Sequence, residues 1–123
     1  MNTYNKPVTI VAALNADHNS APLQLKNMFG YSIQIVWTGT PTGTLKLQAS
    51  SDPLYSGAPG TNPAEPNNWT DVDNSSQSIS SGGNYLWNQT DVMYNWVRVV
   101  FTDSSSGTST AVITSAVFNG KGV

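Results

Sequence analysis

The one histidine of the chain, His18, lies beside Asp17 and Ser20 in a polar stretch. These are the residue types of a nucleophilic triad, in which a histidine base activates a hydroxyl group. A triad is recognised by its spatial geometry, so adjacency in the sequence does not predict one. Cysteine nucleophiles are excluded because the chain has no cysteine. We therefore expect His18 to be a solvated turn residue and the protein not to be an enzyme.

The carboxylates offer a second kind of chemistry, either paired acids for glycoside hydrolysis or ligands for calcium. They are Asp17, Asp52, Glu65, Asp71, Asp73, Asp91 and Asp103. Most fall in expected turns, where aspartate side chains bond to nearby backbone amides. The stretch from Asp71 opens like an EF-hand loop, but Ser76 and Gly82 stand where that loop needs glycine and glutamate. The remaining cofactor hypothesis is a looser calcium site that uses Asp52, Asp71 or Asp73, and otherwise we expect no cofactor.

Aromatic side chains are the most informative candidates. The chain has four tryptophans and five tyrosines, and Tyr85, Trp87, Tyr94 and Trp96 occur as two pairs, each spaced by two residues. The members of each pair share a face of an extended segment. Such rings can fill a thin core, form a protein interface or stack on a sugar, and the sequence leaves these alternatives open. Tyr55 is a further candidate for stacking on a sugar ring.

Composition excludes several classes of function. Charged residues make up only 10% of the chain, and the net charge is −2. The five basic residues are scattered along the sequence, whereas nucleic-acid binding requires a clustered basic footprint. No segment reaches the roughly 20 apolar residues of a membrane span. The N-terminal residues lack the basic region and the sustained apolar run of a signal peptide, so we expect synthesis in a cytoplasm without one.

The elements that must position these residues are strands. Apolar and polar residues alternate along both arms of the stretch Tyr31–Ser50, with Gly39–Gly43 between them. This pattern predicts a β-hairpin or a tight β-arch with one buried face. Four prolines interrupt Ser51–Asn68, which predicts a long surface loop. Val8–Leu14 is expected to be a first strand or an edge segment. Further strands are expected at Pro22–Leu25, Trp69–Val72, Gln77–Ser80, Tyr85–Asn88, Asn95–Thr102 and Ser109–Asn119.

These elements predict a single antiparallel β-sandwich domain over residues 1–123, with about eight strands in a jelly-roll-like or immunoglobulin-like arrangement. The strand Asn95–Thr102 is apolar on both faces, which is typical of a central strand or of one packed against a partner chain. Its second face carries Trp96, Arg98 and Val100. Either these residues form the interface of a homo-oligomer, or they lie under a loop of the same chain.

The segments IQIVWTGTPTGTLKLQASSDP, NNWTDV, YLWN and NWVRVVFT together resemble small β-sandwich proteins encoded among bacteriophage virion genes. The resemblance covers roughly Ile33 to Gly120 and rests on turn and core positions. The LKLQASSD segment with its later tryptophan also looks like discoidin-type and other carbohydrate-binding sandwiches. The chain departs from these by the proline-rich insertion between Asp52 and Trp69.

The phage resemblance implies a non-catalytic virion protein, a capsid decoration or head or tail appendage. Such a protein acts as a homo-oligomer and through contacts with other virion proteins, with Tyr85, Trp87, Tyr94, Trp96, Arg98 and Val100 as interface candidates. The alternative is a carbohydrate-binding module that recognises a host-surface glycan. In that case Tyr55, Trp87 or Tyr94 would stack on sugar rings.

Overall fold

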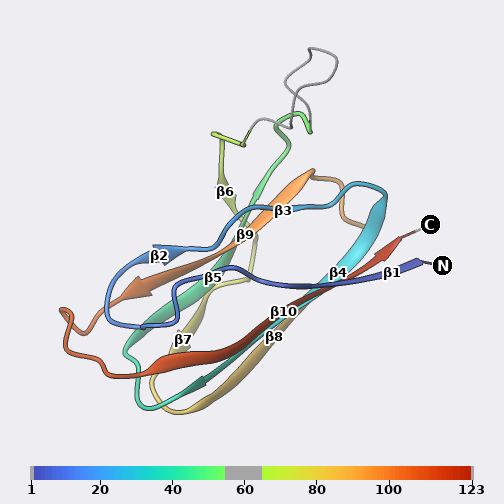
Figure 1. Cartoon of the computed structure of the whole chain (residues 1–123). Coiled ribbons are helices and arrows are strands. Elements are labelled where there is room, and N and C mark those ends of the chain that lie inside the picture. The colour runs from blue at the N-terminus through green and yellow to red at the C-terminus, as the bar shows by residue number, and fades with distance from the viewer. Residues whose placement is uncertain (1, 55–64, 123) are drawn as a thin grey trace.

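The computed structural model describes residues 2–54 and 65–122, which form two antiparallel β-sheets packed face to face (Figure 1). The four-stranded sheet has the spatial order β1 (Asn2–Pro7), β10 (Val112–Gly122), β4 (Met28–Thr38) and β8 (Gly83–Thr90). The path of the six-stranded sheet is β2 (His18–Asn19), β9 (Trp96–Asp103), β5 (Gly43–Ser50) and β6 (Thr70–Asp71). In addition, β3 (Leu23–Gln24) pairs with β9, and β7 (Gln77–Ile79) pairs with β5. The predicted antiparallel β-sandwich is confirmed. No helix in the described part of the chain is long and apolar enough to cross a membrane.

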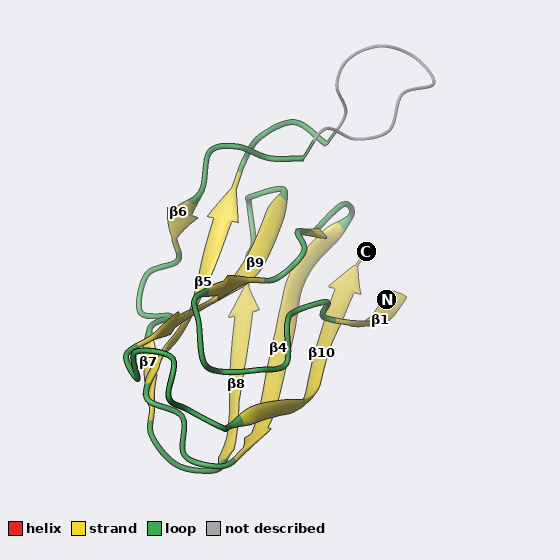
Figure 2. Ribbon diagram, turned by 60° about the vertical axis from the view of Figure 1, so that its left-hand side comes forward, coloured by secondary structure: helices red, strands yellow, loops and turns green. Residues whose placement is uncertain are grey.

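The stretch that was predicted as a hairpin or an arch is an arch. β4 and β5 follow one another in the sequence but lie in different sheets (Figure 2). Gly39 begins the connection with a φ of 89°, and a Cβ atom at this position would lie 2.9 Å from the Cα of Ala111. The arch lets the apolar faces of both arms meet across the core, whereas a hairpin would place them side by side in one sheet.

The core consists of the inward-facing rows of both sheets. Phe101 and Phe118 are the largest fully buried side chains. Around them lie aliphatic residues that are inaccessible to solvent: Ile33, Ile35, Leu45, Leu47, Val97 and Val99. The alternation seen in the sequence therefore corresponds to the inner and outer faces of the strands.

The segment Val8–Leu14, expected as a first strand or an edge segment, forms no strand, and a single β-bridge joins its Ala13 to Val112 of β10. Val8–Leu14 crosses from one sheet to the other, and residues 2–7 form the edge strand β1 in its place. The amides of Val8 and Leu14 donate to carbonyl groups within and just before β10. The segment is apolar because its two ends are buried, and not because it pairs as a strand in one of the sheets.

The long loop falls partly outside the described residues. Its described ends, residues 51–54 and 65–68, form no strand. Tyr55 lies outside the described residues.

We expect Gly43→Ala to lower the free energy of unfolding by about 1–3 kcal/mol, because overpacking strains a dense core. A Cβ atom at Gly43 would collide with the carbonyl oxygen of Thr102 and lie 2.9 Å from the ring of Phe101. Gly83→Ala is the matched control, because no atom lies within 4 Å of its added Cβ. Urea denaturation, monitored by tryptophan fluorescence, measures the free energy of unfolding of both variants. Equal midpoints for the two variants would contradict this account of the core.

Candidate functional site

Tyr85 and Trp87 belong to the core and not to an exposed patch. Both project from the inner face of β8, with their ring centroids 5.2 Å apart and the planes at 73°. Trp87 is buried, and its Nε1 donates to the carbonyl oxygen of Ser75 at 2.8 Å. Tyr85 is half-buried against the same cluster. Of the three roles that the sequence left open for these rings, Tyr85 and Trp87 have the first, which is to fill the core. The ring of Trp87 is therefore not available to a sugar.

Trp96, Arg98 and Val100 are engaged within the single chain. Trp96 and Val100 are buried, and the Nε1 of Trp96 donates to the carbonyl oxygen of Asp52 at 3.1 Å. The guanidinium of Arg98 lies 4.3 Å from the centre of the Trp69 ring. Partial burial lowers the pKa of this guanidinium. The structure thus places Trp96 and Arg98 against residues at the two ends of the long loop of their own chain, and Val100 is buried without a loop contact of this kind in the described part of the chain.

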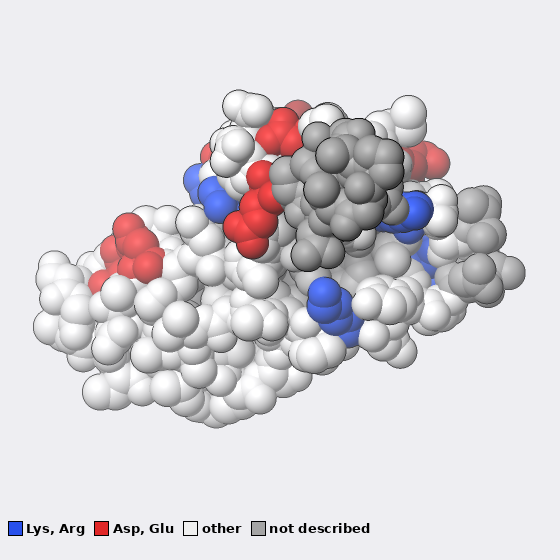
Figure 3. All heavy atoms as spheres, turned by 45° about the horizontal axis from the view of Figure 1, so that its top comes forward, with Lys and Arg blue, Asp and Glu red and all other residues white. Residues whose placement is uncertain are grey.

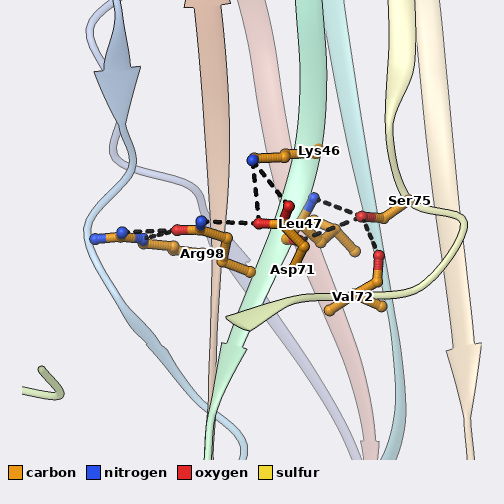
Figure 4. A network of polar contacts seen from close by, with 7 residues as sticks. Lys46, Leu47, Asp71, Val72, Ser75 and Arg98 are labelled. Carbon is orange, nitrogen blue, oxygen red and sulfur yellow. Dashed lines mark hydrogen bonds and ion pairs between the residues drawn. The ribbon is translucent and has the colours of Figure 1, made fainter. Parts of the chain in front are cut away.

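A polar network extends from Arg98 across the outer face of β5 (Figure 4). Both Nε and Nη2 of Arg98 donate to the Oε1 of Gln48, at 2.9 and 2.7 Å. The Nε2 of Gln48 donates to Asp71 at 2.9 Å, and the Nζ of Lys46 forms an ion pair with the same carboxylate at 3.0 Å. The hydrogen bond from Gln48 and the charge of Lys46 lower the pKa of Asp71. The network fixes the short strand β6 at the sheet edge.

The hydroxyl of Ser75 fixes the segment that follows β6. It lies within hydrogen-bond distance of the backbone of Leu47 and Val72 and is buried. Since the carbonyl of Ser75 accepts from Trp87, this residue links the two sheets along one side of the sandwich. The polypeptide that carries Asp73 is thereby held against the core.

Asp52 acts as a cap for the loop. Its Oδ2 accepts from the amides of Asn67 and Asn68 at 2.7 and 3.0 Å, and its Oδ1 accepts from the side chain of Asn68. These hydrogen bonds, with that from the Asn68 side chain the largest, lower the pKa of Asp52. The three carboxylates of the calcium hypothesis do not gather. Among the described residues, no three acidic or histidine side chains could hold a metal ion together.

His18 is not the solvated turn residue that we expected. It lies in β2, and its Nε2 is buried without a hydrogen-bond partner in the described chain. Asp17 instead accepts from the amide of Asp103, and the hydroxyl of Ser20 accepts from the amide of Val99. The three neighbours in sequence have different partners and form no triad.

A polar cleft of about 590 Å³ lies at the end of the sandwich where β5 and β8 finish. Its walls come from the ends of these two strands, from β6 and the residues after it, and from the turn between β8 and β9. The lining residues are Ala49, Ser50, Ser51, Asn68, Thr70, Asp71, Val72, Asp73, Gln89, Thr90, Asp91, Val92 and Tyr94. The volume is within the range of small-ligand sites.

The charge of the polar cleft is negative. Its lining, as far as residues 2–54 and 65–122 form it, includes three aspartates and no lysine or arginine. Asp71 is paired with Lys46, whereas Asp73 and Asp91 have no hydrogen-bond or ion-pair partner within residues 2–54 and 65–122. Asp91 has a φ of 55° in the turn after β8, and the next amide, that of Val92, donates to the carbonyl of Phe29. The space-filling view shows acidic and basic atoms together over its upper part, and most of the rest of the visible surface is uncharged (Figure 3).

Of the two candidates for sugar stacking that the structure describes, Trp87 and Tyr94, Tyr94 lines this cleft. Its hydroxyl lies 2.7 Å from the hydroxyl of Tyr31, and the rings meet edge to face. Burial raises the pKa of both phenols. Both therefore remain neutral hydrogen-bonding groups at physiological pH.

Sequence reasoning missed Asp91, Gln89 and Thr90 as lining residues of the cleft. Asp91 was interpreted only as a turn residue, which its positive φ confirms. The sequence contained no signal that the end of β8 faces Asp73, because that contact depends on the order of the strands.

A second, larger cleft of about 720 Å³ lies between β1, β10 and β3. Leu23, Met28, Trp96 and Phe118 give it an apolar floor, and Lys6 and Lys26 line it. Its wall reaches Gly122, next to residue 123, which lies outside the described residues.

Comparison with known proteins gives a likeness of fold. The chain is similar to chitosan-binding module 1 of a chitosanase/glucanase from Paenibacillus sp. IK-5, with a TM-score of 0.54 and 16% identity, covering 98% of this chain and 94% of that one. Two weaker likenesses are PirA (TM-score 0.47, 15% identity, 97% and 93% covered) and the C-terminal CBM6 of LamC, a laminarinase from Zobellia galactanivorans (TM-score 0.36, 13% identity, 98% and 100% covered). No family model matches the sequence, and no curated protein matches it. The chain thus shares the β-sandwich fold of the chitosan-binding module.

Protonation of Asp52 should release the loop at low pH. Because its pKa is lowered in the folded state, the stabilisation is present above the ordinary value of 3.8 and is lost as the pH falls below it. We expect the amide resonances of Asn67 and Asn68 to shift and their hydrogen exchange to quicken together in that range. Asp52→Asn should show no such transition. An unchanged transition in that variant would contradict the assignment.

Proposed function

We propose that this protein binds carbohydrate in the polar cleft and that its preferred ligand carries amino groups, as a glucosamine polymer does. The observation that carries the proposal is the pair of carboxylates without partners in the described chain, Asp73 and Asp91, in a cleft with no lysine or arginine. A carboxylate that accepts a hydrogen bond from an ammonium group makes a stronger contact than a neutral pair does. The cleft therefore favours a cationic sugar over a neutral or an acidic one.

The remaining lining groups suit the hydroxyl groups of a sugar. Asn68 and Gln89 each offer an amide that can both donate and accept, and Thr70 and Thr90 add hydroxyl groups. Tyr94 contributes an aromatic wall whose hydroxyl is already bonded within the protein. A few convergent polar groups around a concave surface are typical of a small-ligand site.

The fold shared with the chitosan-binding module supports this proposal at the level of architecture, since the identity of 16% shows the fold alone. The acidity of the cleft is a property of this chain itself. The proposal is of binding alone, and the one histidine of the chain lies in β2, away from this end of the sandwich. A virion accessory protein that attaches to a host-surface glycan would use the same cleft. That this chain is such a virion protein stays a prediction.

We expect Asp73→Asn and Asp91→Asn each to weaken binding to soluble chitosan oligosaccharides about tenfold, because each removes one charge-assisted hydrogen bond. Isothermal titration calorimetry measures this at low ionic strength. Added salt should weaken wild-type binding, since salt screens exposed charges. N-acetylated oligosaccharides of equal length should bind more weakly than chitosan oligosaccharides, because they lack the cation.

The matched control is Asp17→Asn, which removes one negative charge at the other end of the sandwich. An asparagine there still offers an oxygen to the amide of Asp103, so the fold is preserved. This control should bind chitosan as the wild type does. Equal losses of chitosan affinity in all three variants would mean that net charge alone attracts the polymer. The proposal would also be contradicted if the wild type showed no saturable binding.

A further inference from the structure

One edge of the four-stranded sheet is open along its whole length. β8 is the last strand of that sheet and pairs with β4 over eight consecutive residue pairs without a bulge. On its other side no strand of the described chain pairs with it, and no loop backbone in residues 2–54 and 65–122 bonds to its backbone. A strand of this kind presents a row of backbone donors and acceptors to solvent.

The other edges of the sandwich carry features that block pairing. β1, at the far edge of the same sheet, contains Lys6 and Pro7. The strands at the edges of the second sheet are only two or three residues long. Charges, prolines and short lengths are the means by which natural sheets prevent edge-to-edge association. β8 has none of these, because Gly83–Thr90 contains no charged residue and no proline.

The exposed face of β8 also offers an apolar contact. Leu86 is 52% exposed at the centre of the strand, on the outer face of the sheet. Asn84 and Asn88, two residues to either side, lie on the same face and are exposed. The set is symmetric about Leu86.

We propose that β8 pairs antiparallel with β8 of a second copy of this chain, about a two-fold axis through Leu86. Side chains directly opposite each other in an antiparallel pair share a face of the sheet. This alignment places Leu86 against its own copy and Asn84 against Asn88 of the second copy on the outer face. The two four-stranded sheets then become one eight-stranded sheet with β1 at both ends.

A second copy suits this edge because the edge is complementary to itself. A two-fold axis brings identical residues together, so any charge near the axis would face a like charge. The uncharged β8 avoids this cost, whereas Lys6 in β1 would incur it. The exposed Leu86 gains an apolar neighbour, and the amides of Asn84 and Asn88 can bond across the axis. This inference does not depend on the carbohydrate proposal.

The test is the solution mass of the full chain by sedimentation equilibrium over a wide concentration range. We expect a reversible dimer for the wild type. Leu86→Lys should raise the dissociation constant at least about tenfold, because it sets two lysines opposite each other. Val117→Lys is the matched control: Val117 is 43% exposed on the same outer face but lies in β10, which is paired on both sides. It should dimerise as the wild type does.

A mixture tests the register. Leu86→Lys and Leu86→Asp should each associate at least about tenfold more weakly than the wild type when alone, and should form a heterodimer when mixed, because opposite charges then face each other. Far-UV circular dichroism confirms that each variant is folded. A wild type that stays monomeric at millimolar concentration overturns the proposal. It is also overturned if Val117→Lys dissociates the dimer as strongly as Leu86→Lys does, or if the mixture fails to associate.

Discussion

The contact on which the structure depends is the meeting of the inner faces of β4 and β5 across the core. Ile33 and Ile35 from one arm and Leu45 and Leu47 from the other are fully buried. Burial of apolar surface is the main favourable term in folding, at about 25 cal/mol per Å². The two arms are joined by a short arch, so this contact brings the two sheets together with a small loss of chain entropy. In the finished sandwich the other strands extend the two sheets on either side of β4 and β5.

The end of the sandwich that carries the polar cleft is held by hydrogen bonds from residues at and just before the start of β9. The side chain of Asn95 donates to the carbonyls of Ser51 and Asp52, and the indole of Trp96 donates to the second of these. The carboxylate of Asp52 then orders the amides at the far end of the loop. These bonds fix both ends of the long loop against β9. The polar cleft lies beside them, and its shape thus depends on a few hydrogen bonds together with the packing of Tyr94 on Tyr31.

The sequence predicted the parts of the fold that period and turn chemistry determine. The sandwich, the inward rows of the arch and the short strand around Leu23 follow from alternation and from glycine and proline. Strand order was not predictable, because it depends on long-range pairing that no local pattern records. This limit explains the site as well. Trp87 and Trp96 have the spacing of an exposed aromatic patch, but their burial depends on which sheet each strand joins. Asp73 and Asp91 meet at one cleft only because β6 and β8 end on the same side.

The proposed dimer and the proposed glycan site are linked through β8. Gln89 and Thr90, near the end of this strand, line the polar cleft, while Leu86 marks the proposed axis. Gln89 is three residues from Leu86, so an antiparallel dimer would separate the two copies of Gln89 by about 20 Å along the strands. The two clefts would lie at opposite ends of one continuous sheet. A polymer carries many equivalent sugars, and once one cleft is occupied the second binding event becomes intramolecular. Two weak clefts on a rigid sheet would therefore hold a long chain much more tightly than a short oligosaccharide. In this arrangement the pairing of the two β8 strands sets the distance and the direction between the two clefts, and the edge of β8 contributes to polymer binding in this way.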